Sequence, residues 1–210
     1  MRVLAIDTAS EACSAALFED DVKLGGFSEV IGRGHAERLV PLIARLPGRG
    51  RAERICVSLG PGSFTGVRIG LAAARALGLA WRAQVLGYPT LALVAAMARG
   101  SEARPVSVAV AGGHGEWFVQ NFGGDGMPQG DLASLRPQAA AQAASHPLVA
   151  GSQAQALVER RGHGTACVIL PDARALPALP GALLTPSLTP IYGRPPDARL
   201  PGATAQSRRA

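Results

Sequence analysis

The sequence has 210 residues, of which 48% are hydrophobic and 17% are charged, a composition typical of a folded globular protein rather than a disordered one. No apolar stretch reaches the roughly 18 residues that cross a membrane, because Arg75 interrupts the longest one, Leu71 to Trp81. The apolar run before Asp7 is too short for the core of a signal peptide. We therefore expect a cytoplasmic protein without membrane contacts.

The formal net charge of +6 comes almost entirely from arginine, since the chain has a single lysine, Lys23. Such an excess favours nucleic acids or acidic proteins as partners. The densest basic groups lie in a loop (residues 45–54) and at the end of the chain (residues 194–209), and neither is interleaved with aromatic residues. Arginine-rich genome composition explains the same bias equally well.

The three cysteines, Cys13, Cys56 and Cys167, are far apart in mostly apolar surroundings and form no C-x-x-C pair. This pattern predicts buried free thiols rather than disulfides.

The first hundred residues alternate between strands and helices, with Glu19-Asp20-Asp21 as a tight turn in an opening antiparallel meander. The first helix carries apolar residues three or four positions apart, on one face. The predicted elements are the strands Arg2 to Asp7, Ala12 to Phe18 and Val22 to Val30, a helix His35 to Leu46, a strand Arg54 to Leu59, a helix Thr65 to Trp81, a strand Gln84 to Gly87 and a helix Thr90 to Arg99. This order is that of the ribonuclease-H-like half of the actin and sugar-kinase architecture, so the predicted fold class is α/β.

A second unit begins with a hairpin of two strands, Val106 to Ala111 and Glu116 to Phe122. The segments that follow are rich in glycine, alanine, glutamine and proline, so we expect them to add few residues to a hydrophobic core. We predict a first lobe over residues 1–104, a reduced second lobe over residues 105–192, and a flexible basic tail over residues 193–210.

Asp7 and Thr8 follow the first strand, where kinases and actin-like proteins carry an acidic residue and a phosphate-facing turn. Such turns usually contain glycines whose N–H groups approach the phosphate, whereas this chain continues with alanine, serine and Glu11, which would repel an anion. Asp7, Thr8 and Ser63 are the candidates for a nucleotide-proximal site. The alternative is that Asp7 caps backbone donors at the end of the strand.

The segment Gly60 to Gly70 reads Gly-Pro-Gly-Ser-Phe-Thr-Gly-Val-Arg-Ile-Gly. It lacks the lysine of a P-loop, so a tight strand-to-helix turn is the simpler interpretation. In the helix that follows, small residues recur every four positions, at Gly66, Gly70, Ala74 and Gly78. Because an interior glycine costs a helix about 1 kcal/mol relative to alanine, this pattern indicates that something packs very close, either the protein's own sheet or a partner's helix.

No catalytic constellation is evident. The four histidines, His35, His114, His146 and His163, form no H-x-x-x-H pair, and Ser63 does not lie in a G-x-S-x-G elbow. We predict no catalytic residue and no metal ligand, and we expect His35 on the surface at the start of a helix.

Three segments carry a resemblance to a known family. They are Leu4-Ala5-Ile6-Asp7-Thr8-Ala9-Ser10-Glu11-Ala12-Cys13-Ser14, His35-Ala36-Glu37-Arg38-Leu39-Val40-Pro41-Leu42-Ile43, and Gly60 to Gly70. Together they closely resemble the bacterial TsaB (YeaZ) family, densely over the first hundred residues and thinly beyond them. One departure is Ala111-Gly112-Gly113, where family members usually carry Asp-Ala-Arg.

The resemblance implies an actin-like (ASKHA) protein that acts in making N6-threonylcarbamoyladenosine, next to the anticodon of tRNAs that read codons beginning with A. In that family the TsaB type is not the enzyme but an inactive paralogue and scaffold, which binds and activates the catalytic subunit TsaD. The ATPase TsaE joins the complex. The resemblance also implies a homodimer when the protein is alone, tRNA reached through the complex, no cofactor of its own, and ATP or ADP only at the complex interface.

The resemblance places the contact with TsaD on the first two helices. Carried onto this sequence, the predicted partner-interface residues are His35, Leu39, Leu42, Ile43, Leu46, Gly66, Arg68, Gly70 and Ala74. Some of the leucines must face the sheet instead, and the sequence does not separate them. On this interpretation Gly70→Leu blocks pairing but leaves the monomer folded.

Two rival hypotheses stay open. The first is an active ATP-dependent kinase or peptidase-like enzyme of the actin-like superfamily. The second is a tRNA-binding module that acts through its basic tail, with strong salt dependence.

Overall fold

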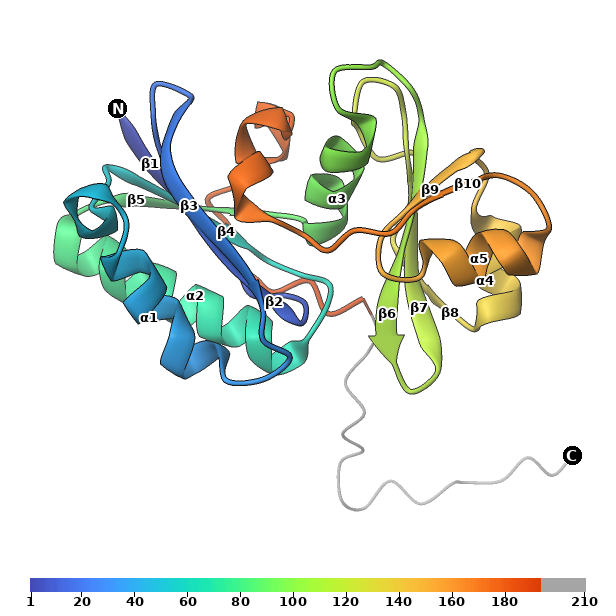
Figure 1. Cartoon of the computed structure of the whole chain (residues 1–210), viewed down its shortest axis with the longest axis horizontal. Coiled ribbons are helices and arrows are strands. Elements are labelled where there is room, and N and C mark those ends of the chain that lie inside the picture. The colour runs from blue at the N-terminus through green and yellow to red at the C-terminus, as the bar shows by residue number, and fades with distance from the viewer. Residues whose placement is uncertain (194–210) are drawn as a thin grey trace, which may run out of the picture.

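Two five-stranded sheets face each other, with helices between them and on both outer sides (Figure 1). The structure is a computed structural model that describes residues 1–193. The predicted flexible tail therefore lies outside the described residues, apart from Gly193. Within residues 1–193, none of the helices combines the length and the hydropathy that crossing a membrane requires.

The first sheet has the order β3-β2-β1-β4-β5. Its strands are β1 (Arg2–Asp7), β2 (Ala12–Glu19), β3 (Val22–Val30), β4 (Arg54–Ser58) and β5 (Gln84–Tyr88). The first three strands pair antiparallel, and β1, β4 and β5 pair parallel. Leu4, Ala5 and Ile6 of the central strand are all fully buried, because elements cover both faces of the sheet.

Helices cover the first sheet on both sides (Figure 1). The side of the sheet that points away from the second sheet carries α1 (His35–Ala44), the short 3-10 turn η1 (Pro47–Gly50) and α2 (Phe64–Trp81), while α3 (Thr90–Arg99) lies on the side that faces the second sheet. Ser63 caps α2, since its hydroxyl accepts a hydrogen bond from the backbone N–H of Gly66 at 3.2 Å. The predicted strands and helices of this half lie within two residues of the observed ones.

The second sheet has the order β10-β9-β6-β7-β8. Its strands are β6 (Val106–Gly113), β7 (Glu116–Phe122), β8 (Ala133–Leu135), β9 (Leu148–Ala150) and β10 (Thr165–Cys167), and α4 (Pro137–Ala143) and α5 (Ala154–Arg161) cover its outer face. The alanine-rich stretch in α4 contributes more core than predicted. Ala140 and Ala141 are buried and share a cluster with Trp117 and Leu157.

The largest core lies between the two sheets and takes residues from both, together with α3 and η2 (Ala173–Ala178). Tyr88, Leu91 and Phe122 are among its most deeply buried side chains. The predicted boundary at residue 104 falls in the loop between α3 and β6, and the division into two lobes stays a prediction.

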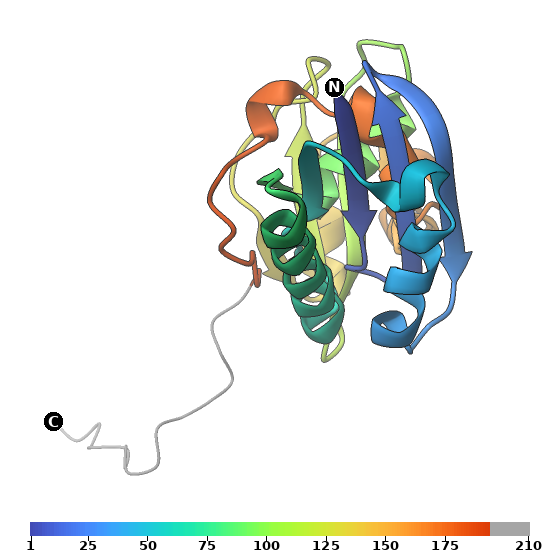
Figure 2. The ribbon, with the colours of Figure 1, turned by 90° about the vertical axis from the view of Figure 1, so that its left-hand side faces the viewer.

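After the second sheet the chain returns to the first one through η2 and η3 (Gly181–Leu183). Residues 184–193, here called the strap, then run beside α2 (Figure 2). Thr185 pairs with Gly87 of β5 through two backbone hydrogen bonds, and the N–H of Ile191 donates to the carbonyl of Leu59 at 2.7 Å. No local sequence pattern predicts this return, because the paired segments are far apart in the chain.

Candidate functional site

The apolar stripe of α1 faces the protein's own first sheet. Leu39, Leu42 and Ile43 are at most 3% exposed, and Leu46, just beyond the helix, is equally buried. All four belong to the core cluster that includes Leu4 and Ile6 of β1. The prediction that they form a partner interface is therefore corrected, because packing on the sheet leaves their side chains no surface to offer.

The small-residue face of α2 also packs on this sheet. A Cβ added to Gly66 would lie 2.0 Å from the carbonyl oxygen of Thr8, and one added to Gly70 would lie 2.5 Å from Oγ1 of Thr8. Ala74 is fully buried. Of the two interpretations of this pattern, the protein's own sheet is the right one, and Gly66, Gly70 and Ala74 are corrected from partner contacts to core positions.

His35 is 6% exposed, not on the surface as predicted. Its Nε2 lies 3.3 Å from the carbonyl oxygen of Ala12, which accepts a hydrogen bond from it. The ring therefore joins the start of α1 to β2. A polar residue at the start of a helix does not reveal such a contact, because its partner is 23 residues away.

The carboxyl group of Asp7 is completely buried at the end of β1. Burial raises its pKa to about 6, and hydrogen bonds from Ala9, Ser58 and Tyr88 offset part of the rise. Its Oδ1 accepts from the N–H of Ala9 at 2.9 Å, and the hydroxyl of Tyr88 lies 3.3 Å from its Oδ2. The alternative that Asp7 caps backbone donors describes this geometry.

Thr8 is 1% exposed, and its hydroxyl donates to the carbonyl of Gly66 at 2.8 Å. The next carbonyl, that of Ala9, accepts the N–H of Ser63 at 2.6 Å. The chain itself thus fills the turn that holds a phosphate in kinases and actin-like proteins. The prediction that Asp7 and Thr8 lie beside a nucleotide is corrected, because neither side chain reaches the surface.

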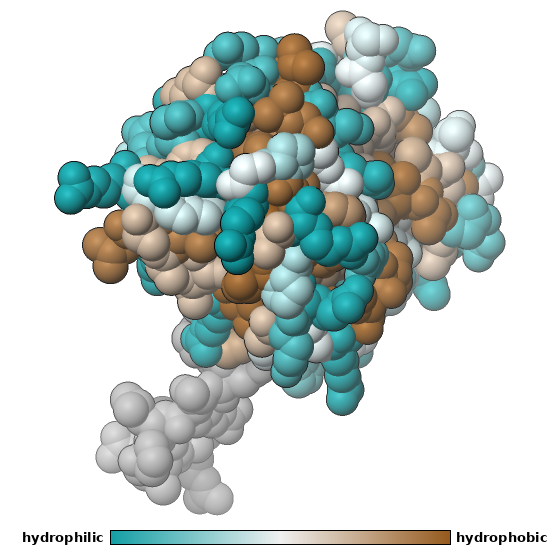
Figure 3. All heavy atoms as spheres, turned by 60° about the vertical axis from the view of Figure 1, so that its left-hand side comes forward, coloured by the Kyte–Doolittle hydropathy of each residue, from teal (hydrophilic) through white to brown (hydrophobic). Residues whose placement is uncertain are grey.

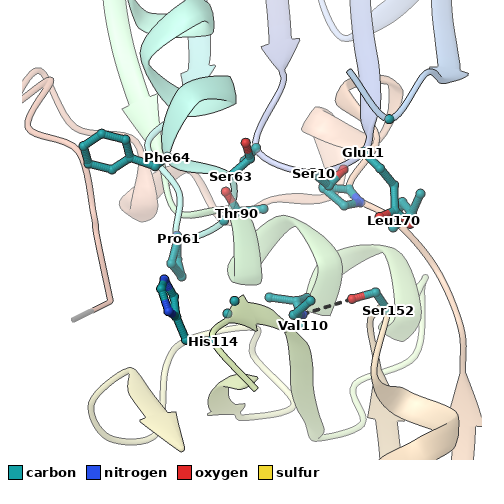
Figure 4. Close-up of a pocket in the computed structure, with 17 residues that line it drawn as sticks. Ser10, Glu11, Pro61, Ser63, Phe64, Thr90, Val110, His114, Ser152 and Leu170 are labelled. Carbon is teal, nitrogen blue, oxygen red and sulfur yellow. Dashed lines mark hydrogen bonds between the residues drawn. The ribbon is translucent and has the colours of Figure 1, made fainter. Parts of the chain in front are cut away.

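A cleft of about 410 Å³ opens between the two sheets (Figure 4). The β1–β2 loop, the turn before α2, the β6–β7 hairpin and the segment after β10 line it, with Ser10, Glu11, Pro61, Ser63, His114 and Ser152 among the contributors. Ser63 is the one nucleotide-proximal candidate that borders this cleft. The contributions of the hairpin and of Ser152 were missed, since they come from the other sheet and no short-range pattern connects them with Ser63.

Among residues 1–193, no group of three or more histidine, cysteine or acidic side chains is placed to hold a metal ion. All three cysteines are free; Cys13 and Cys56 are buried as predicted, and Cys167 is half-buried. Burial raises the pKa of Cys13 and of Cys56 to about 11, so both thiols stay protonated at neutral pH.

The side of α1 and α2 that points away from the sheet is exposed and largely apolar. We call it the outer face and define it by its exposed apolar residues, which are Ala36, Val40, Pro41, Ala44, Ala72, Ala76, Leu79 and Ala80. Glu37 and Arg38 of α1 and Thr65 of α2 are exposed on the same side. Val40 is 53% exposed and Leu79 is 85% exposed. Figure 3 shows apolar side chains gathered on this side of the molecule between polar ones.

Arg68 differs from the other predicted interface residues because its side chain is exposed. Its guanidinium carbon lies 3.6 Å from the centre of the Phe64 ring, and its Nη2 donates to the hydroxyl of Tyr192 in the strap at 3.3 Å. This contact spans 124 positions in the sequence, which is why no motif predicted it.

Comparison with known proteins assigns the chain. The family model described as TsaD, tRNA N6-adenosine threonylcarbamoyltransferase, matches residues 20–130, just over half of the chain. The tRNA threonylcarbamoyladenosine biosynthesis protein TsaB of Escherichia coli is 40% identical over 100 residues, which are 45% of this chain and 43% of that protein. The TsaB protein of Haemophilus influenzae is 36% identical over 100 residues, 45% of this chain and 41% of that protein. The chain thus spans less than half the length of these curated relatives.

Solved structures match over most of the fold. YeaZ from Pseudomonas aeruginosa has a TM-score of 0.75 and 28% identity, with 91% of this chain and 99% of that chain covered. An uncharacterized protein with similarity to peptidase YEAZ, also from Pseudomonas aeruginosa, has a TM-score of 0.73 and 31% identity, with 85% and 89% covered. The predicted α/β fold class is confirmed, and the fold is that of YeaZ. With its sequence relatives and its fold in agreement, the chain belongs to the TsaB (YeaZ) family.

Proposed function

We propose that this chain is a non-catalytic subunit for the synthesis of N6-threonylcarbamoyladenosine in tRNA, and that it acts in the cytoplasm by binding and activating the transferase TsaD. The names of the curated relatives support the pathway. The family model that matches the chain is described as the transferase itself, which supports a common ancestry with the proposed partner.

The observation that carries the proposal is the outer face of α1 and α2. On α2, Ala72, Ala76 and Ala80 recur every four residues and are exposed, so they line one side of the helix. Small side chains let another helix approach closely, and the neighbouring Val40 and Leu79 supply apolar area that water would otherwise cover. A helix of TsaD is the proposed occupant, and a second copy of this chain takes its place when TsaD is absent.

The interior of the first sheet supports a non-catalytic role. Asp7 and Thr8 are fully engaged with the chain itself, and the N–H of Ser63 at the start of α2 binds the carbonyl of Ala9. A nucleotide phosphate would have to displace these contacts. We therefore propose that ATP or ADP is held only where this chain and TsaD meet, and that TsaE supplies the ATPase of the complex.

The test is light scattering of the full chain with the TsaD of the same organism, together with an assay for threonylcarbamoyladenosine. We expect a mixed complex, and modified adenosine only when both proteins are present. Ala76→Arg places a long charged side chain on the outer face and should abolish the complex. Ala143→Arg, at an exposed alanine of α4, is the matched control and should leave it intact.

Two results would refute the proposal. A complex that tolerates Ala76→Arg would remove the outer face as the docking surface. Turnover of ATP or cleavage of a peptide by the purified chain alone would instead favour the rival hypothesis of an active kinase or peptidase-like enzyme.

A further inference from the structure

Three side chains from two distant parts of the sequence meet beside the cleft. Phe64 and Arg68 lie in the first turns of α2, and Tyr192 lies near the end of the strap. The two aromatic rings are 5.2 Å apart between centres and tilted by 36°, and the guanidinium carbon of Arg68 lies 3.6 Å from the centre of the Phe64 ring and 5.7 Å from that of Tyr192. We call these residues the aromatic–arginine cluster.

Both rings of the cluster remain open to solvent. Phe64 is 54% exposed and Tyr192 is 38% exposed, and they are the two aromatic residues among the exposed large hydrophobic residues of positions 1–193. Phe64 also borders the cleft (Figure 4). Core packing does not account for two exposed rings side by side, because neither is enclosed by the protein.

The surroundings of the cluster are basic. The sequence has no acidic residue between Glu53 and Glu102, or between Asp172 and Asp197, so neither α2 nor the strap carries a negative charge. Arg75 lies on the same side of α2, where it donates to the carbonyl of Leu188 in the strap at 3.0 Å and remains exposed. Glu11, which lines the cleft, comes from the β1–β2 loop.

This side of α2 borders the outer face. At 100° per residue, Phe64, Arg68 and Arg75 fall within one narrow sector of the helix, next to the strap. Leu79 and Ala72 of the outer face follow within about 40° of Arg68, and Ala76 and Ala80 lie further round the helix. A ligand on the cluster therefore occupies a sector of α2 next to the one that carries Ala76 and Ala80.

We propose that the aromatic–arginine cluster is an RNA-contact surface, which takes an unpaired nucleotide. One base stacks on the exposed ring of Phe64 or Tyr192, and Arg68 and Arg75 neutralise the adjacent phosphates. Exposed rings beside two arginines favour RNA over an acidic peptide, because a base stacks on a ring face and a carboxylate does not. The inference deepens the proposed function by giving this subunit a direct contact with RNA, and it is tested without TsaD.

The probe is a fluorescently labelled single-stranded RNA oligonucleotide, and the readout is the anisotropy on titration with the full chain at several salt concentrations. We expect binding that weakens as salt rises. Phe64→Leu keeps an apolar side chain but removes the ring face and should weaken binding about 5-fold or more, whereas Phe64→Tyr should retain it. Arg68→Gln should weaken binding and flatten its salt dependence.

Matched controls separate the cluster from general charge. Arg160→Gln removes the same charge from an exposed arginine of α5 and should bind RNA like the parent chain. Equal losses in Arg160→Gln and Arg68→Gln would overturn the proposal. Undiminished RNA binding by Phe64→Leu would also overturn it. The proposal would fail as well if a poly-glutamate peptide displaced the RNA and bound Phe64→Leu and Phe64→Tyr with equal affinity.

Two further measurements distinguish the cluster from the basic tail, and RNA binding from TsaD binding. A chain that ends at Gly193 tests the arginines beyond it, and loss of all binding on this truncation with none in Phe64→Leu would overturn the cluster as the contact. Light scattering with TsaD should give the same complex for Phe64→Leu as for the parent chain. Failure of RNA binding with an intact complex would overturn this inference and leave the proposed function standing.

Discussion

Thr8 and Gly70 are in direct contact between the end of β1 and the middle of α2. A Cβ on Gly70 would lie 2.5 Å from Oγ1 of Thr8, and that oxygen cannot simply move away because it donates to the carbonyl of Gly66. Cγ2 of Val57 in β4 would lie 3.4 Å from the same added Cβ. The glycine is therefore required by the protein's own sheet.

Gly70→Leu should destabilise the folded monomer, contrary to the expectation from the sequence. Overpacking a tight site costs about 1 to 3 kcal/mol or more, and here the Thr8 hydrogen bond is lost as well. Urea denaturation of the purified variant measures the loss of unfolding free energy. Ala72→Leu, two residues further along α2 and exposed, is the control and should change stability little. Equal stability of Gly70→Leu and the parent chain would contradict the packing described.

Asp7 should make stability depend on pH. Its folded-state pKa, about 6, lies above the ordinary value of 3.8 for an aspartate, so the folded protein binds the proton more tightly than the unfolded chain. The contribution of this group to the unfolding free energy therefore grows as pH falls from about 7 to about 4, by up to about 3 kcal/mol. Above pH 7 the buried charge is a constant cost.

Asp7→Asn should abolish this contribution, because the amide is neutral at every pH. Its oxygen can still accept from Ala9, and its NH₂ group can donate to the hydroxyl of Tyr88. The test compares denaturation midpoints of the parent chain and the variant from pH 4 to pH 8. Asp21→Asn, at an exposed turn position, should leave the pH profile of the parent unchanged. Parallel profiles for Asp7→Asn and the parent would rule out the titration of Asp7.

Tyr88→Phe should weaken the same network from its other end. The hydroxyl donates to the carbonyl of Ile6 at 2.9 Å and lies 3.3 Å from Asp7, and all three residues are fully buried. Its removal should cost about 1 to 3 kcal/mol of unfolding free energy. Because the carboxylate loses a donor, the pKa of Asp7 should rise further and the gain in stability at low pH should increase. Combining Tyr88→Phe with Asp7→Asn should remove that gain, which a double-mutant cycle measures.

Local patterns predicted the first sheet and its helices because each of those elements is specified by its own residues. The turn Glu19-Asp20-Asp21 separates β2 from β3, and the spacing of leucines defines α1. The same patterns did not separate a face that packs on the sheet from one that meets a partner, because both are apolar or small. Eight of the nine predicted interface residues are buried within the chain. The exposed alanines of α2, Ala72, Ala76 and Ala80, were not among the predicted interface residues.

Long-range contacts account for what the sequence could not predict. The cleft combines loops of both sheets, and Arg68 meets Tyr192 across 124 positions. The strap has no periodicity of its own, since backbone hydrogen bonds to β5 and the carbonyl of Leu59 fix its path. A pattern confined to one segment carries no information about such a path.

Ile191 should determine whether the strap stays in place. Its N–H donates to the carbonyl of Leu59, and its half-buried side chain packs against the core of the first sheet, next to Tyr192. Ile191→Asp places a charge in that contact and should release the strap, so the amides of Gly87 and Thr185 should exchange with deuterium much faster. Thr189→Asp adds the same charge at an exposed strap position and should leave exchange unchanged. Because the same anchor positions Tyr192, Ile191→Asp should also weaken RNA binding, and Thr189→Asp should weaken it less. Slow deuterium exchange at the amides of Gly87 and Thr185 in Ile191→Asp would contradict the prediction, because the strap would then be held without Ile191.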